Sequence, residues 1–205
     1  MFERSSLAGL ARLVRNGYLA RTGWLRSVRL GKPVSANGDP IPWLTFPAIA
    51  FLESRVRSSM QIFEYGSGNS TLWWARRVAY VESCEHDPNW AQVVRPLLPN
   101  NAQLRLLALD QTTKYSTAAA DAGRRFDIVV IDGHDRVNCA RSCLQALKPD
   151  GVVIWDNSDR EEYAEGYEHL QNLGFRRIDF NGLGPINAYS WTTSAFYRDL
   201  NCLGI

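Results

Sequence analysis

From residue 61 onward, short apolar runs alternate with segments long enough to form a helix. Phe126–Ile131 (FDIVVI) is a nearly continuous apolar run, which is typical of a strand covered on both faces. The predicted strands are Gln61–Tyr65, Ala79–Ser83, Gln103–Leu109, Phe126–Ile131, Val152–Trp155, Phe175–Phe180 and Trp191–Tyr197. This alternation predicts an α/β fold with a doubly wound, mostly parallel sheet. A loop rich in Gly, Pro and Asn joins the last two strands, so we expect them to pair antiparallel.

Helix signals separate the predicted strands. Asp87 followed by Pro88 is typical of a helix N-terminus. The residues that follow have a 3.6-residue apolar period, carried by Trp90, Val93, Val94 and Leu97.

The first sixty residues have a different character. Residues 1–40 contain six Arg and one Lys but only two acids, and they are helix-compatible with breaks at Gly17 and Gly23. Thr45 is a plausible N-cap for a helix within Trp43–Val56. We expect a helical cap or lid over residues 1–60 and a catalytic domain over residues 61–205. A solvated helix, an anionic partner and a membrane surface are the alternatives for the basic segment.

Composition excludes several classes of protein. The net charge of +2 gives no global field for nucleic acid, so no nucleic-acid partner is expected. No apolar run approaches the roughly 20 residues that a transmembrane helix needs. The four cysteines form no CxxC pair, which favours buried, reduced thiols in a cytoplasmic protein rather than a zinc site.

In doubly wound sheets, ligands bind at the carboxyl ends of the strands, near the point where strand order reverses. The first predicted strand ends in Glu64 and Tyr65, and a turn containing Gly66 and Gly68 follows it. Thr71 stands where a dinucleotide fingerprint would have its third glycine. A carboxylate before the glycines suits the cationic amino group of S-adenosylmethionine better than a pyrophosphate.

The second and third strands end in further acids. Glu85 lies nineteen residues beyond Gly66, close to the roughly 20 expected for an acid that binds ribose hydroxyls. A surface carboxylate is the alternative for Glu85. His86 is expected to flank the adenosine. Asp110 is expected near the adenine, with a loop-capping aspartate as an equal alternative.

Acids also end the fourth and fifth strands, where Asp132 and Asp156 should lie side by side. Neighbouring carboxylates repel, so they need a cation, a proton or a basic partner. With Asn157 they offer oxygen ligands of the kind that Mg²⁺ prefers, whereas helix caps or loop hydrogen bonds are the alternative. His134 is the histidine placed to act as a general base.

Together these motifs resemble the class I S-adenosylmethionine-dependent methyltransferases over about residues 61–198. The resemblance rests on EYGSGNST, ESCEHD, FDIVVIDG, LKPDGVVIWDN and the C-terminal strand pair. It implies a seven-stranded sheet with an antiparallel C-terminal strand. It also implies that the cofactor is held by Glu64, Gly66, Ser67, Gly68, Asn69, Ser70, Thr71, Glu85, His86, Asp110 and Asp132.

The acids after the fourth and fifth strands are similar to those of the metal-dependent catechol and caffeoyl-CoA O-methyltransferases. That similarity implies Mg²⁺ on Asp132, Asp156 and Asn157. The lysine base of those enzymes is replaced here by Asp135, so His134 is the substitute candidate. The Pro-Pro-aromatic motif of enzymes that methylate amines of nucleic acid bases is absent after the fifth strand.

We therefore expect methyl transfer to an oxygen, or in second place a nitrogen, of a small molecule. Asp132, His134 and Asp156 are the expected catalytic residues. Aromatic residues of the N-terminal segment either cover the cofactor or pack against the sheet, and its basic helix could support a homodimer. An NAD-linked oxidoreductase and a non-catalytic binding or scaffold protein are the alternative functions.

Overall fold

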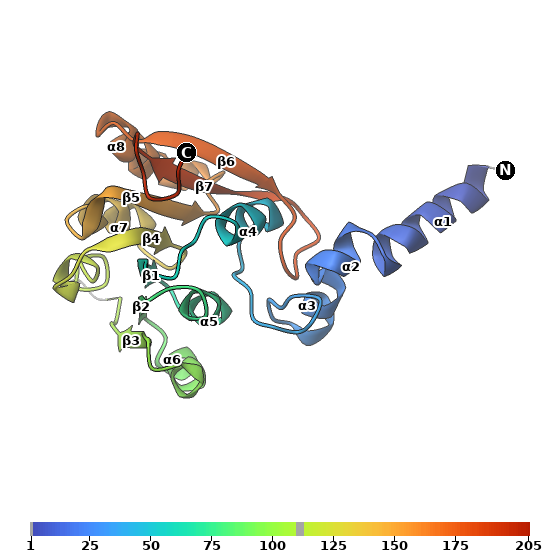
Figure 1. Ribbon diagram of the computed structural model, residues 1–205, viewed down its shortest axis with the longest axis horizontal. Coiled ribbons are helices and arrows are strands. Elements are labelled where there is room, and N and C mark those ends of the chain that lie inside the picture. The colour runs from blue at the N-terminus through green and yellow to red at the C-terminus, as the bar shows by residue number, and fades with distance from the viewer. Residues whose placement is uncertain (1, 110–112) are drawn as a thin grey trace.

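A computed structural model describes residues 2–109 and 113–205 of the chain. Its centre is a seven-stranded sheet in the order β3-β2-β1-β4-β5-β7-β6 (Figure 1). The strands are β1 (Gln61–Tyr65), β2 (Tyr80–Glu85), β3 (Ala102–Leu106), β4 (Phe126–Ile131), β5 (Leu147–Asp156), β6 (Arg176–Gly182) and β7 (Trp191–Tyr197). The seven predicted strands are confirmed, with β1, β4 and β7 matching at both ends.

The first five strands pair parallel, and β7 pairs antiparallel with both β5 and β6. The predicted fold class is thereby confirmed. The chain runs from β1 outward to β3 and then returns to place β4 on the other side of β1. The strand order therefore reverses between β1 and β4, which puts the ligand-binding edge at Gly66 and Asp132.

Helices connect the strands and precede them. The α-helices are α1 (Phe2–Arg15), α2 (Tyr18–Thr22), α3 (Trp24–Leu30), α4 (Phe46–Glu53), α5 (Asn69–Ala75), α6 (Pro88–Val94), α7 (Arg136–Cys143) and α8 (Ala164–Asn172), and the short 3-10 helices are η1 (Arg95–Leu97), η2 (Ala120–Ala122) and η3 (Glu161–Tyr163). The predicted breaks at Gly17 and Gly23 are confirmed. Gly23 and Gly31 have positive φ angles of 83° and 62° and end α2 and α3.

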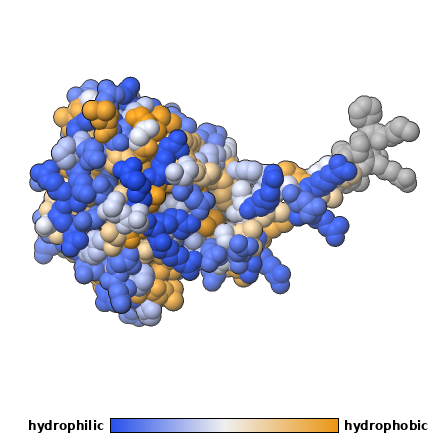
Figure 2. All heavy atoms as spheres, viewed as in Figure 1, coloured by the Kyte–Doolittle hydropathy of each residue, from blue (hydrophilic) through white to orange (hydrophobic). Residues whose placement is uncertain are grey.

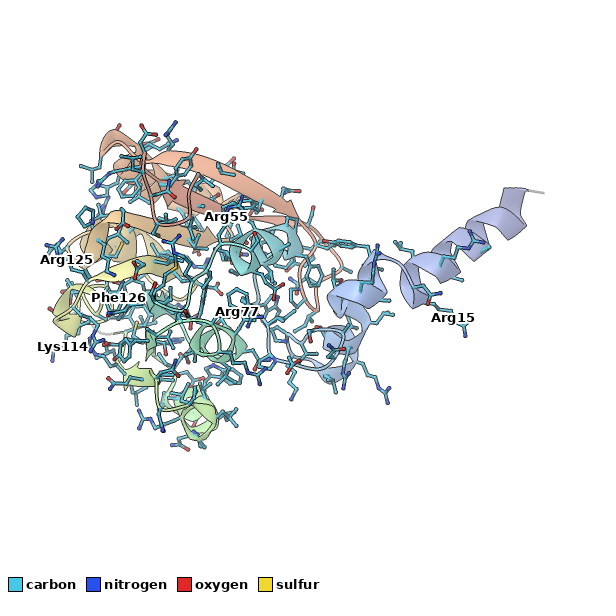
Figure 3. All side chains as sticks on the ribbon, viewed as in Figure 1. Arg15, Arg55, Arg77, Lys114, Arg125 and Phe126 are labelled. Atoms are coloured by element: carbon cyan, nitrogen blue, oxygen red, sulfur yellow. The ribbon has the colours of Figure 1, made fainter. Side chains whose placement is uncertain are left out.

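Both faces of the sheet are buried because side chains alternate along each strand. On one face Ile62 and Ile128 pack with α4 and α5. On the other face Phe63 and Val129 pack with α7 and α8. Phe126 belongs to this second core and lies inside the body of the molecule in Figure 3. The apolar runs of the sequence are therefore the central strands of a two-sided core.

The N-terminal segment is divided between the core and the periphery. Thr45 caps α4 through its hydroxyl, which accepts from the Ala48 amide at 3.4 Å and donates to the Phe180 carbonyl at 2.8 Å. The predicted cap is thus confirmed, and α4 packs into the core of the sheet. In contrast, α1 projects away from the body and carries Arg15 far from the sheet (Figures 1 and 3).

Helix α6 begins where the sequence predicts, with the Asp87 carboxylate accepting from the Asn89 amide at 2.8 Å. Only part of its apolar period, however, is turned toward the sheet, since Val94 is buried and the other three predicted positions are not. Trp90, Val93 and Leu97 are 45%, 56% and 59% exposed. Figure 2 shows hydrophobic spheres at the lower edge of the body, where Figure 1 places α6. This face of α6 is available for a ligand.

The cysteines confirm the predicted burial, since Cys84, Cys139, Cys143 and Cys202 are all buried and free. Within residues 2–109 and 113–205, no helix has the length and apolar character needed to cross a bilayer.

Candidate active site

The turn after β1 brings the backbone close to the end of β4. Gly66 and Gly68 have φ angles of 98° and 152°, a conformation that favours glycine. A Cβ on Gly66 would lie 3.3 Å from the carbonyl oxygen of Asp132. The Asp132 amide donates to the Tyr65 carbonyl at 3.1 Å, so the two strand ends are joined at this point. Gly66 therefore allows the turn after β1 to pack closely against the end of β4.

Glu64 lies fully buried beneath this turn. Its Oε2 accepts from the Thr71 hydroxyl at 2.5 Å, and that hydroxyl accepts from the Gly68 amide at 3.1 Å. Thr71 thus links the carboxylate to the glycine turn, which a third glycine could not do. The Oε1 atom makes no hydrogen bond of standard geometry within the described residues, although the Ser70 and Trp74 side chains lie close enough to lower the pKa of Glu64. Burial raises the pKa of Glu64 to about 7.

Glu85 lies at the end of β2, on the opposite side of the turn. Its carboxylate accepts from the Ser67 hydroxyl at 2.8 Å and from the amides of His86 and Asp87 at 2.8 and 3.0 Å. The His86 Nδ1 lies 3.0 Å from the same carboxylate. The acid predicted to bind ribose is therefore fixed in place beside the glycine turn.

His86 and His134 meet above these acids, with ring centroids 4.1 Å apart. Desolvation, followed by the charges of His86 and Arg136, lowers the pKa of His134. Both rings line a polar cavity of about 480 Å³, which also includes Glu64, Gly66 and Glu85. We call it the polar cavity. It contains most of the residues that the sequence assigned to the cofactor, whereas Asp110 lies outside the described residues.

A second, larger hollow of about 750 Å³ lies on the other side of the glycine turn. We call it the apolar cleft. It is lined by residues of the N-terminal segment, the glycine turn, α6, the ends of β4 and β5, and the loop before β7. The two hollows share Ser67, Ser70, Trp90, Asp132 and Arg160. They are therefore adjoining parts of one site.

Asp156 lines the apolar cleft and is only 3% exposed. Its Oδ1 accepts from the Trp191 indole at 2.9 Å and from the Thr193 hydroxyl at 2.5 Å. Burial nevertheless raises the pKa of Asp156 to about 6, because the loss of solvent outweighs these hydrogen bonds. The carboxyl group therefore changes its charge close to neutral pH.

Arg136 is the residue that sequence reasoning missed. Its guanidinium donates to Asp132 Oδ1 at 3.2 Å, to the Gly133 carbonyl at 2.8 Å and to the Asp156 carbonyl. It thus joins the ends of β4 and β5 as the basic partner that the two acids require. The available signal was its spacing, since an arginine four residues after Asp132 lies at the start of the next helix.

Arg136 does not fully offset the repulsion between the carboxylates of Asp132 and Asp156. Burial, and then the neighbouring Asp156, raise the pKa of Asp132 well above its ordinary value despite Arg136. Asp132, Asp156 and Asn157, the three expected metal ligands, all line the apolar cleft. No group of three or more His, Cys, Asp or Glu side chains suited to a metal occurs in the described part of the chain. The predicted Mg²⁺ set, which includes an asparagine, stays a prediction.

Comparison with known proteins agrees with this geometry. Residues 63–158, which include the glycine turn and both strand-end acids, match a family described as a methyltransferase domain. This segment is a methyltransferase domain on a class I, Rossmann-like fold, as S-adenosylmethionine-dependent methyltransferases have. None of the curated proteins matches the sequence.

Solved structures share the methyltransferase's fold at low sequence identity. Precorrin-6y C5,15-methyltransferase from Geobacter metallireducens is 13% identical with a TM-score of 0.60, covering 75% of this chain and 87% of that one. Precorrin 8w decarboxylase from Methanobacterium thermoautotrophicum is 19% identical with a TM-score of 0.56, covering 82% and 97%. A candidate O-methyltransferase from Klebsiella pneumoniae is 21% identical with a TM-score of 0.56, covering 93% and 95%. Such identities establish the fold and leave the acceptor open.

Proposed function

We propose that this methyltransferase transfers a methyl group from S-adenosylmethionine to an oxygen of a small molecule bound in the apolar cleft. The observation that carries the proposal is the position of Asp156. It is a buried acid in a cleft that directly adjoins the polar cavity, and its pKa lies close to neutrality.

The polar cavity fits the cofactor on two structural grounds. Gly66 lines the polar cavity and Gly68 lines the adjoining cleft, so a ligand can approach the backbone of the glycine turn. The unpartnered Glu64 Oε1 is a buried acceptor that a cationic amino group would satisfy. In this proposal Glu85 and His86 hold the ribose and adenine end.

The chemistry requires few protein groups. When bound, S-adenosylmethionine supplies a methyl group whose bond to sulfur breaks as an acceptor oxygen attacks, leaving a neutral thioether. The protein must align that oxygen, exclude water and accept the hydroxyl proton. Asp156 accepts the proton in our proposal. The Trp191 and Thr193 donors hold its Oδ1, so Oδ2 is the oxygen left for the acceptor.

We propose a different role for His134 from the general base that the sequence suggested. It lines the polar cavity and is not among the residues of the apolar cleft, whereas Asp156 is. We therefore assign the base role to Asp156 and place His134, with His86, beside the cofactor. Asp132 borders both hollows, and in our proposal it positions the reacting groups with Arg136.

The size of the cleft favours a small molecule. A volume of about 750 Å³ falls within the range of small-molecule sites. Oxygen is favoured over nitrogen because Asp156 can remove a hydroxyl proton during attack.

The test supplies labelled S-adenosylmethionine with phenols and with anilines of the same shape. We expect label on the phenol oxygen, with the rate falling below about pH 6 as Asp156 becomes protonated. His134→Gln should keep most of the rate, whereas Asp156→Asn should lose it. Label on anilines alone, or loss of turnover in His134→Gln only, would contradict the proposal.

A further inference from the structure

The apolar cleft collects hydrophobic side chains that the fold leaves uncovered. Six of the large exposed hydrophobic residues line it, namely Leu30, Trp43, Trp90, Val93, Leu97 and Tyr189. Exposed apolar surface that gathers in one concave place is typical of a ligand site. The part of the acceptor that lies along these walls must therefore be apolar.

Hydrogen bonds between distant segments hold the walls of the cleft in place. Asn69 donates to the Pro33 carbonyl at 2.6 Å, which ties the N-terminal segment to the glycine turn. The Trp90 indole donates to the Ser67 carbonyl at 2.9 Å. The Trp24 indole donates to the Asn187 carbonyl at 2.8 Å. The cleft is thus a formed site with flat indole surfaces, which suits a planar ring system.

The charges in the cleft are unevenly distributed. Its acids, Asp132 and Asp156, lie at the strand ends, and Asp156 is buried. Lys32 is exposed on the wall formed by the N-terminal segment, and its side chain has no hydrogen-bond or ion-pair partner in the part of the chain that the structure describes. Arg160, the other cation of the cleft, lies 3.6 Å from Glu162. The open end of the cleft therefore offers a free positive charge.

From these observations we propose that the acceptor is a planar, apolar hydroxy acid. Its hydroxyl group lies at Asp156, its rings lie against the indole and aliphatic walls, and its acidic group pairs with Lys32. This inference rests on the proposed function, because it places the acceptor hydroxyl at Asp156.

Two fluorescent probes of the same ring system test the inference: 6-hydroxy-2-naphthoate and 2-naphthol. Binding is measured by fluorescence titration with S-adenosylhomocysteine present. We expect the naphthoate to bind about three- to fivefold more tightly, the effect of one partly exposed ion pair. Lys32→Met should abolish this preference and leave naphthol binding unchanged. Arg29→Met, a nearby cation that does not line the cleft, is the control.

The apolar wall is tested in the same titrations. Val93→Ser should weaken both probes, whereas Leu173→Ser, an exposed leucine outside the cleft, should weaken neither. Equal affinity of the wild type for both probes, or a preference that survives in Lys32→Met, would overturn the inference.

Calorimetry with S-adenosylhomocysteine alone separates this inference from the proposed function. If S-adenosylhomocysteine binds and neither probe does, the hydroxy acid assignment fails while the cofactor site stands. If both probes bind as expected and labelled S-adenosylmethionine methylates neither, the transfer to oxygen fails while the cleft assignment stands.

Discussion

The polar cavity and the apolar cleft lie on two sides of one glycine turn, yet they are built differently. The polar cavity consists mainly of residues at or just after the ends of β1, β2 and β4, and its buried acids are held by neighbouring amides and hydroxyls. The apolar cleft takes its walls from the N-terminal segment, α6 and the loop before β7. In our proposal the sheet therefore defines the cofactor end of the site, and the attached segments define the acceptor end.

In our proposal this difference separates the binding of the cofactor from the selection of the acceptor. The strand ends are fixed by the pairing of β1, β2 and β4, so a polar cavity at this place follows from the fold itself. The walls of the cleft depend on side chains of helices and loops that can change without altering the sheet. Changes in the polar cavity should affect every acceptor, whereas changes in those helix and loop walls should affect one acceptor more than another. Asp156, at the end of β5, belongs to the cleft but not to these walls.

The largest effect is expected from Asp156→Asn, which keeps the acceptor for Trp191 and removes the base. We expect the rate of methyl transfer to fall about 100- to 1000-fold, with cofactor affinity unchanged. Single-turnover kinetics and calorimetry with S-adenosylhomocysteine measure the two quantities. Asp150→Asn, an exposed aspartate toward the other end of β5, is the control. A parallel loss of cofactor affinity would place Asp156 in the polar cavity instead.

Glu64→Gln should affect the polar cavity and not the apolar cleft. Loss of a buried carboxylate from the cofactor amino group should weaken S-adenosylmethionine binding about 10- to 100-fold at pH 8. Glu82→Gln, a buried glutamate on β2 that lines neither hollow, should leave binding unchanged. Equal affinities in the two variants at pH 8 would remove Glu64 from the site.

The same variant also changes the pH dependence of stability. The pKa of Glu64 is raised to about 7 in the folded protein, so the unfolded chain loses this proton at lower pH than the folded protein does. The free energy of unfolding should therefore fall as the pH rises from about 4.5 to 7, by about 3 kcal/mol for this group. Urea unfolding of the protein without ligand at pH 5 and pH 8 should show this loss in the wild type and a smaller one in Glu64→Gln.

Trp191→Phe should have a smaller effect on the cleft. The variant keeps a ring but removes the indole donor that lowers the pKa of Asp156. The acidic limb of the pH–rate profile should move to higher pH, because the Asp156 carboxylate loses a stabilising hydrogen bond. The rate at pH 7 should therefore fall about three- to tenfold. An unshifted limb would mean that Asp156 is not the group whose ionisation limits the rate.

Removal of divalent metal should have the smallest effect. Arg136 already supplies a positive charge between the ends of β4 and β5, where the sequence suggested Mg²⁺. We expect EDTA to change the rate of methyl transfer by less than about twofold. A rate that is lost in EDTA and restored by Mg²⁺ would instead support the set Asp132, Asp156 and Asn157.

The sequence predicted the polar cavity better than the cleft, for a physical reason. Glu64, Gly66 and Glu85 lie at or just after the ends of strands, and the end of a parallel strand can be located from local apolar patterns. The cleft requires contacts between residues as distant as Lys32, Val93 and Tyr189, which no local pattern connects. The apolar period of α6 was visible, but the choice between sheet and ligand as its partner depends on tertiary packing.

Arg136 shows, within a single site, the same limit of prediction from local sequence patterns. Its position after Asp132 was known, but its bond to the Asp156 carbonyl depends on β4 and β5 being neighbours in register. The sequence therefore indicated that two acids needed a cation and left its identity open among a metal, a proton and a basic side chain.

The central claim is that the polar cavity binds S-adenosylmethionine. Calorimetry of the wild type and Glu64→Gln with S-adenosylhomocysteine, S-adenosylmethionine and NAD tests it most directly. We predict binding of both adenosyl ligands to the wild type, weaker binding of S-adenosylmethionine to Glu64→Gln, and no response to NAD. Tight binding of NAD without a response to either adenosyl ligand would contradict the account.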